Sequence, residues 1–337
     1  MRTYRTLVFL AAFLTFDLIM FGAFVRLTDS GLGCPDWPGC YGHFTPLGAH
    51  ASIQQALEAM PYGPVSAFQA WIEMIHRYAG AILGMLIIGF MVLAWRLRRS
   101  LPYRPTLATV IFGLVCLQGA FGAWTVTHRL MPVVVTTHLV LGMSLLAMLT
   151  WLAAREKSHA AVPAHAGNGR IWMVLGFVVL FLQLALGGWV STNYAALACM
   201  DFPTCHGAWL PTMDFDSGFA LLRGLGQASS GEIISQDALT AIHWTHRNFA
   251  FLVIALLGVL AWRWRHTSGL KGPARALLAL LALQLLTGLT TIFFQWPLLI
   301  AVIHNGGAAA LVLVSTTLLW RLSRAGKPPS GRGHQHA

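Results

Sequence analysis

The chain has 337 residues, of which 56% are hydrophobic and only 10% are charged, and its mean hydropathy is +0.65. This composition is far from that of a soluble globular domain and is typical of a polytopic membrane protein. The formal net charge of +11 would suit a nucleic-acid-binding protein, but the basic residues form no binding patch, so nucleic acid is excluded as a partner.

Eight apolar segments are long enough to cross a lipid bilayer as helices, because the hydrocarbon core requires about 20 residues per helix. The first segment is too long, and too closely followed by others, for a cleaved signal peptide. The sequence therefore predicts an all-α polytopic membrane protein. We expect its helices near residues 6–27, 68–95, 105–127, 132–154, 171–192, 238–262, 274–295 and 297–320.

The basic residues predict the orientation of these helices. If the N-terminus is cytoplasmic, 17 of the 22 Lys and Arg residues fall on the cytoplasmic side. This positive-inside bias predicts that both termini are cytoplasmic and that two long loops, near residues 28–67 and 193–237, face outward. The five basic residues expected outside are Arg26, Arg77, Arg129, Arg223 and Arg247.

Both outer loops contain the pattern C-x-D-aromatic-P-x-C, from Cys34 to Cys40 in the first and from Cys199 to Cys205 in the second. An oxidising exterior favours a disulfide within each loop, and pairing between the two loops stays open. Zinc is less favoured, because a five-residue spacer between cysteines is not a usual ligand spacing.

The cysteine loops belong to an internal repeat that extends through the chain at offsets of 165 to 170 residues. We infer two four-helix halves that run in the same direction, related by a pseudo-twofold axis along the membrane normal. The expected domains are an N-terminal bundle (1–154), a cytoplasmic linker (155–170), a C-terminal bundle (171–322) and a disordered tail (323–337). Matched positions include Gly22 and Gly187, Gln118 and Gln284, Gly122 and Gly288, and His138 and His304.

Four histidines lie inside the apolar segments, where ionisable residues are costly and by default mark a functional site. They are His76 and His138 in the first half and His246 and His304 in the second. All four are expected about 9–12 Å below the outer helix ends. Two histidines at one depth in a four-helix unit can ligate a haem iron from opposite faces. The alternative is that each histidine joins neighbouring helices through hydrogen bonds.

Two further pairs of residues flank these candidate ligands. Arg77 and Arg247 directly follow a histidine and could pair with haem propionates, or they could extend to lipid head groups. Three residues before the histidine, the first half has Glu73 and the second has His243. A carboxylate beside a haem could transfer protons, or it could be a structural partner for a nearby arginine or hydroxyl. This asymmetry suggests that one half reacts and the other holds a permanent cofactor.

The remaining polar residues are not expected to be part of the candidate haem sites. Asp17, in the first helix, belongs either to a proton path or to a contact with a neighbouring helix. We expect the other outer-side histidines to be surface residues: His43, His50, His128 and His206.

Several stretches together resemble the haem A synthase family, whose members mature the haem of cytochrome oxidases. They are GAFVRLTDSGLGCPDWPGCYG, which begins at Gly22, and EMIHR, TTHLVLG, HWTHR and IHNGGA. The resemblance extends from the first helix to the eighth. It implies an eight-helix protein of two four-helix bundles that oxidises the C8 methyl group of haem O to a formyl group, through a hydroxymethyl stage.

The resemblance also implies roles for individual residues. His246 and His304 would ligate a resident haem b, and His76 and His138 would face the substrate haem with Glu73 beside it. The cysteine loops resemble those of a bacterial branch with disulfides in the outer loops. Implied partners are haem O, the haem O synthase that supplies it, and an electron-transfer partner that the sequence does not identify. The implied location is the bacterial cytoplasmic membrane.

Two other classes of protein would also explain parts of the pattern. A di-haem b-type electron-transfer cytochrome needs two bis-histidine sites, but it does not need a proton acceptor beside one haem. A transporter would explain the duplicated halves, but transporters typically have broken helices near the midplane, whereas these histidines gather toward one side.

Overall fold

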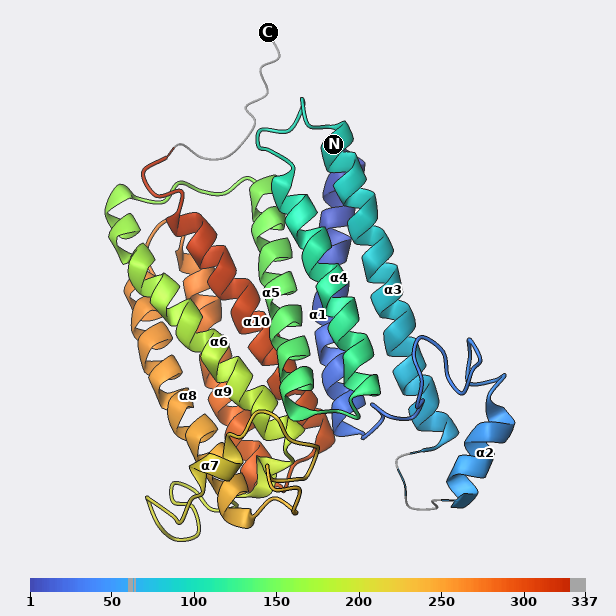
Figure 1. The fold of residues 1–337 in the computed structure, drawn as a ribbon. Coiled ribbons are helices and arrows are strands. Elements are labelled where there is room, and N and C mark those ends of the chain that lie inside the picture. Colours follow the sequence, from blue (N-terminus) through green and yellow to red (C-terminus); the bar gives the residue numbers. More distant parts are fainter. Residues whose placement is uncertain (60–62, 64, 328–337) are drawn as a thin grey trace.

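The computed structural model describes residues 1–59, 63 and 65–327 (Figure 1). Its eight long helices are apolar enough to span a membrane, which confirms the predicted segments. No strand occurs in the described residues, so the predicted all-α class is also confirmed. The long helices are α1 (Arg2–Leu27), α3 (Ala67–Arg96), α4 (Thr106–Thr127), α5 (Pro132–Glu156), α6 (Arg170–Thr192), α8 (Gln236–Trp264), α9 (Lys271–Phe293) and α10 (Leu298–Leu322).

The shorter helices lie in the connections. They are α2 (His50–Ala59), α7 (Phe215–Gly218) and two 3₁₀ helices, η1 (Ala164–Gly169) and η2 (Ala195–Leu197). The two long connections, from α1 to α3 and from α6 to α8, lie at the end of the molecule opposite both described termini (Figure 1). This agrees with the prediction that both cysteine loops share one side.

Equivalent helices of the two halves begin in the same way. Ser66 caps α3 by accepting a hydrogen bond from the Gln69 N–H over 3.2 Å, and Ser235 caps α8 through the Ala238 N–H over 3.2 Å. Such caps satisfy backbone donors that the first helical turn leaves unpaired. These two helices carry His76 and His246, so the local sequence fixes the start of both.

The helices of each half pack in a ring. In the first half α1 contacts α3 and α5, and α4 completes the ring; in the second half α6 contacts α8 and α10, and α9 completes it. Contacts of α10 with α1 and α5, and of α5 with α6, join the halves. One apolar core lies mainly in each half. This packing is compatible with the expected pair of four-helix bundles.

The linker and the start of the tail pack against each other. The Gly326 N–H donates to the carbonyl of Val162 over 2.9 Å, and Arg321 of α10 lies 3.2 Å from Nδ1 of His159. The expected disordered tail (323–337) is therefore ordered at its start, through residue 327. Its remainder, 328–337, lies outside the described residues.

Candidate functional site

Each of the four histidines packs against a glycine of a neighbouring helix. A methyl group placed on any of these glycines would lie only 3.0–3.5 Å from Cε1 of the facing ring. The absence of a side chain therefore makes room for the imidazoles of His76, His138 and His246, whereas a methyl group on Gly288 would lie at an ordinary contact distance from His304. The four pairs are Gly22 with His76, Gly122 with His138, Gly187 with His246, and Gly288 with His304.

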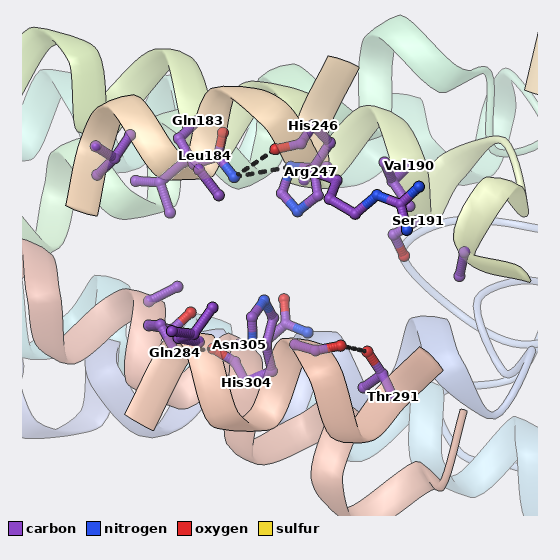
Figure 2. Close-up of a pocket in the computed structure, with 18 of the residues that line it drawn as sticks. Gln183, Leu184, Val190, Ser191, His246, Arg247, Gln284, Thr291, His304 and Asn305 are labelled. Atoms are coloured by element: carbon purple, nitrogen blue, oxygen red, sulfur yellow. Dashed lines mark hydrogen bonds between the residues drawn. The ribbon is translucent and has the colours of Figure 1, made fainter. Parts of the chain in front are cut away.

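In the second half, the two histidines lie on opposite walls of a cavity. Figure 2 shows His246 of α8 and His304 of α10 facing each other, with Arg247 toward one end of the cavity. The cavity walls are largely apolar and include side chains from α5, α6, α8, α9 and α10: Leu139, Leu180, Leu184, Val253, Leu281 and Leu311.

This donor set fits a haem. Two imidazoles across an apolar cavity supply axial ligands of the kind that b-type cytochromes use, and the apolar walls suit a flat macrocycle. Arg247 at the cavity end offers a cation of the right shape for a carboxylate. The residues of the second-half site are therefore compatible with a haem held between two imidazoles.

The first half places its two histidines differently with respect to their polar neighbours. Nε2 of His138 lies 3.3 Å from the side-chain nitrogen of Gln118. The equivalent glutamine of the second half, Gln284, instead donates to the backbone carbonyl of His304 over 2.9 Å. The ring of His76 packs beside Phe21, with 5.7 Å between the ring centroids.

Glu73 is buried, with 4% of its surface exposed, and is held by two donors. One carboxylate oxygen accepts the Cys34 N–H over 2.9 Å, and the other pairs with Arg77 at 2.5 Å. The structure thus bears out the expected arginine partner of Glu73. Whether Glu73 also transfers protons stays a prediction.

Arg77 of α3, the helix that carries His76, binds the first cysteine loop. Its guanidinium donates to the carbonyls of Asp36 over 2.8 Å and Gly39 over 2.6 Å. The sequence does not predict these two contacts, because every residue has a backbone carbonyl and none stands out as a partner. Propionate binding by Arg77 stays a prediction.

Arg247 of α8 makes the equivalent contacts with the second cysteine loop. It donates to the carbonyls of Asp201 over 2.7 Å and Thr204 over 3.0 Å. These positions match Asp36 and Gly39 at the repeat offset of 165.

Both cysteine loops are closed by a disulfide within the loop. Cys34 bonds to Cys40, and Cys199 bonds to Cys205, so the prediction of one disulfide per loop is confirmed. In the second loop, hydrogen bonds from the Thr204 hydroxyl and from the backbone N–H groups of His206 and Gly207 lower the pKa of Asp201 to about 2.

The residues with smaller expected roles lie away from this site. Asp17 is exposed on α1, and no hydrogen bond or ion pair among the described residues involves it. Of the two alternatives for Asp17, pairing with a neighbouring helix is not seen among the described residues, and a part in a proton path stays a prediction. The other outer-side histidines are exposed, as expected: His43, His50, His128 and His206.

Two features of the site were missed from the sequence. The matched glycines stand out in the sequence only as part of the repeat, although Gly122 and Gly288 each precede their histidine by the same 16 residues, which is a usable signal. Gln183 and Thr287, which contact ring nitrogens of His246 and His304, were also missed. Their signal is that polar residues stand where the first half has apolar ones.

Comparison with known proteins identifies relatives over nearly the whole length. Residues 5–316 match the COX15-CtaA family model, described as "Cytochrome oxidase assembly protein". The Heme A synthase of Shewanella oneidensis is 38% identical over 315 residues, which cover 92% of this chain and 94% of that protein. The Heme A synthases of Caulobacter sp. and Caulobacter vibrioides are 28% and 29% identical, each across 94% of this chain and 95% of the relative.

Proposed function

Because the chain belongs to the COX15-CtaA family of cytochrome oxidase assembly proteins, we propose that it is a membrane oxidoreductase that converts haem O into haem A. The reaction oxidises the C8 methyl group of haem O to a formyl group through a hydroxymethyl intermediate. The observation that carries the proposal is the pair of histidines that faces across an apolar cavity, together with its repeat in the first half. The relatives do not support the di-haem electron-transfer cytochrome, since they are named Heme A synthase.

The second half holds a resident haem b between His246 and His304. Supporting this assignment are the apolar cavity that the two rings share and Gly187, which makes room for the ring of His246. When bound, haem b supplies one-electron redox chemistry. Arg247 lies at one end of the cavity, where its guanidinium can pair with a propionate.

The first half binds haem O through His76 and His138. Conversion of the methyl group to a hydroxymethyl group, and then to a formyl group, takes two two-electron oxidations. With water as the source of the oxygen atom, each oxidation releases two protons and two electrons, so each needs a proton acceptor and an electron acceptor. Glu73 takes the proton, because it is a buried carboxylate one helical turn from His76. Arg77 pairs with Glu73 and would reach a propionate from the same side of the helix. The electrons pass to a separate electron-transfer partner.

The protein spans the bacterial cytoplasmic membrane with both termini in the cytoplasm. The distribution of basic residues supports this orientation. It exposes both disulfide loops to the oxidising side, where disulfides persist. Haem O, made by haem O synthase, enters the first half from within the same membrane.

Haem extraction tests the function directly. Membranes from cells that make haem O, with and without this chain, are extracted and their haems separated by chromatography. We expect haem A only when the chain is present, and haem O alone with a His76→Ala/His138→Ala variant. Unchanged haem O in the presence of the wild-type chain would overturn the proposal.

A further inference from the structure

The candidate ligands of the second half are held through the ring nitrogen that faces away from the cavity. Nδ1 of His304 lies 2.8 Å from the hydroxyl oxygen of Thr287. That hydroxyl has a single proton, which it donates to the carbonyl of Leu283 over 2.8 Å. The oxygen therefore accepts the Nδ1–H of His304. This leaves the lone pair on Nε2, the form of imidazole that binds a metal.

His246 has a polar partner at the same ring atom. The side-chain nitrogen of Gln183 lies 3.1 Å from Nδ1 of His246 and 3.1 Å from its carbonyl oxygen. The amide oxygen of Gln183 is buried without a hydrogen-bond partner in the described part of the chain. Because the amide nitrogen donates to the carbonyl of His246 and also lies against Nδ1, Gln183 of α6 holds the position of the His246 ring.

The ligands of the first half lack such partners. Nδ1 of His76 and Nδ1 of His138 are both buried, and neither has a hydrogen-bond partner among residues 1–59, 63 and 65–327. The contact of His138 with Gln118 is made by Nε2 instead. In the described part of the chain, neither ring is therefore held at Nδ1, and the one side-chain partner of His138 faces Nε2, the nitrogen that carries the free lone pair in His304.

The difference in ring partners between the two halves corresponds to sequence differences at matched positions of the repeat. At the repeat offset of 165, Gln183 corresponds to Leu18, and at the offset of 166, Thr287 corresponds to Phe121. Both replacements are apolar and cannot form a side-chain hydrogen bond. The glutamines and glycines around them are matched between the halves, so the anchoring residues are a specific difference.

We propose that Gln183 and Thr287 are positioning residues that anchor the axial histidines of a retained haem, and that Leu18 and Phe121 leave the first-half histidines free to exchange a haem substrate. This inference rests on the proposed function. Hydrogen-bonded outer partners fix the ring orientation of a ligating histidine and raise its basicity, and their loss typically costs about 10–100-fold in metal affinity. Retention suits a resident cofactor, whereas exchange suits a substrate that must leave as product.

Haem transfer from the purified full-length protein to excess apomyoglobin measures this anchoring. We expect Thr287→Val and Gln183→Leu to release b-type haem about 10–100-fold faster than the wild type. Thr287→Ser keeps the hydroxyl and should release haem at close to the wild-type rate. Thr287→Val should also shift the haem b midpoint potential to a more positive value, because a less basic imidazole stabilises ferric iron less well.

The reciprocal variants test the same idea in the other half. Leu18→Gln and Phe121→Thr, alone and combined, should slow the release of haem O or haem A from the first half without changing haem b. They report on the proposal even if the second-half variants fail to fold. Wild-type release rates and potential in Thr287→Val and Gln183→Leu would overturn it, as would equal losses in Thr287→Ser and Thr287→Val. None of these readouts requires haem A formation, so failure of the proposed function is seen separately, in the haem extraction.

Discussion

Glu73 accepts a hydrogen bond from the backbone N–H of Cys34 over 2.9 Å, which ties a buried carboxylate on the His76 helix to the first disulfide loop. In the second half, His243 stands in its place and donates through Nδ1 to the carbonyl of Ala195 over 2.9 Å. The two halves therefore use the same helix position to hold the same loop region. Only the first half places an anionic side chain there.

The variant Glu73→Gln tests the proposed proton acceptor. Glutamine keeps the shape and can accept a hydrogen bond, but it cannot take up a proton at neutral pH. We expect haem A formation to slow by about 10²–10⁴-fold, with haem O or the hydroxymethyl intermediate accumulating while haem b is retained. Extracted haems, quantified by chromatography, provide the measurement.

The matched control for this variant is Glu58→Gln, which changes an exposed carboxylate on α2. Its haem A formation should equal that of the wild type. If Glu73→Gln makes haem A at the wild-type rate, Glu73 serves only as a structural partner of Arg77 and Cys34.

The variants His246→Ala and His304→Ala test the resident cofactor. Each removes one proposed axial ligand from the wall of an apolar cavity, so the purified protein should lose most of its b-type haem. His76→Ala and His138→Ala should leave most of the haem b in place. Pyridine haemochrome spectra give the haem b content per chain. Stoichiometric haem b in the His246→Ala/His304→Ala double variant would mean that the cofactor lies elsewhere.

Substitutions of the glycines that face the histidines should weaken haem b binding to different extents. A methyl group on Gly187 would lie 3.0 Å from His246, whereas one on Gly288 would lie 3.5 Å from His304, an ordinary contact distance. Overpacking typically costs about 1–3 kcal/mol, so Gly187→Ala should weaken haem b binding by about 5- to 150-fold. Gly288→Ala should have a smaller effect.

Gly272 supplies the control for the glycine series, because it lies on α9 with open space where a methyl group would go. Haem transfer to apomyoglobin ranks the three variants. An order other than Gly187→Ala, then Gly288→Ala, then Gly272→Ala would show that the close approach does not position the rings.

The second cysteine loop is held both by a disulfide and by Arg247. Removing the disulfide with Cys199→Ser/Cys205→Ser should lower the free energy of unfolding by roughly 2–3 kcal/mol, the entropic value for so short a loop. The loop should nevertheless stay in place, because Arg247 still binds its carbonyls. Limited proteolysis of the outer loops should then be nearly unchanged.

Adding Arg247→Gln to the disulfide variant removes the second attachment, so cleavage in the second loop should become much faster. Limited proteolysis followed by mass spectrometry of the fragments locates the cuts. Rapid cleavage already in the disulfide variant would show that Arg247 does not hold the loop.

The sequence by itself determined the membrane class and the eight helices, and it indicated an internal repeat. Apolar runs of helical length report directly on the solvent around them, and a repeat needs no structure to be seen. It also singled out the four histidines and both cysteine pairs, because such residues are rare in apolar segments or are paired at matching offsets. These are properties of composition and spacing along the chain.

Only the tertiary structure decided which atoms meet. Arg77 and Arg247 donate hydrogen bonds to loop carbonyls. From the sequence, an arginine beside a candidate ligand could equally contact a haem propionate or a lipid head group. The contacts of Gln183 and Thr287 with the histidine rings depend on helices far apart in the sequence. A side chain's role at a site is fixed by the direction in which its helix face points and by what packs there, and neither is encoded in local sequence alone.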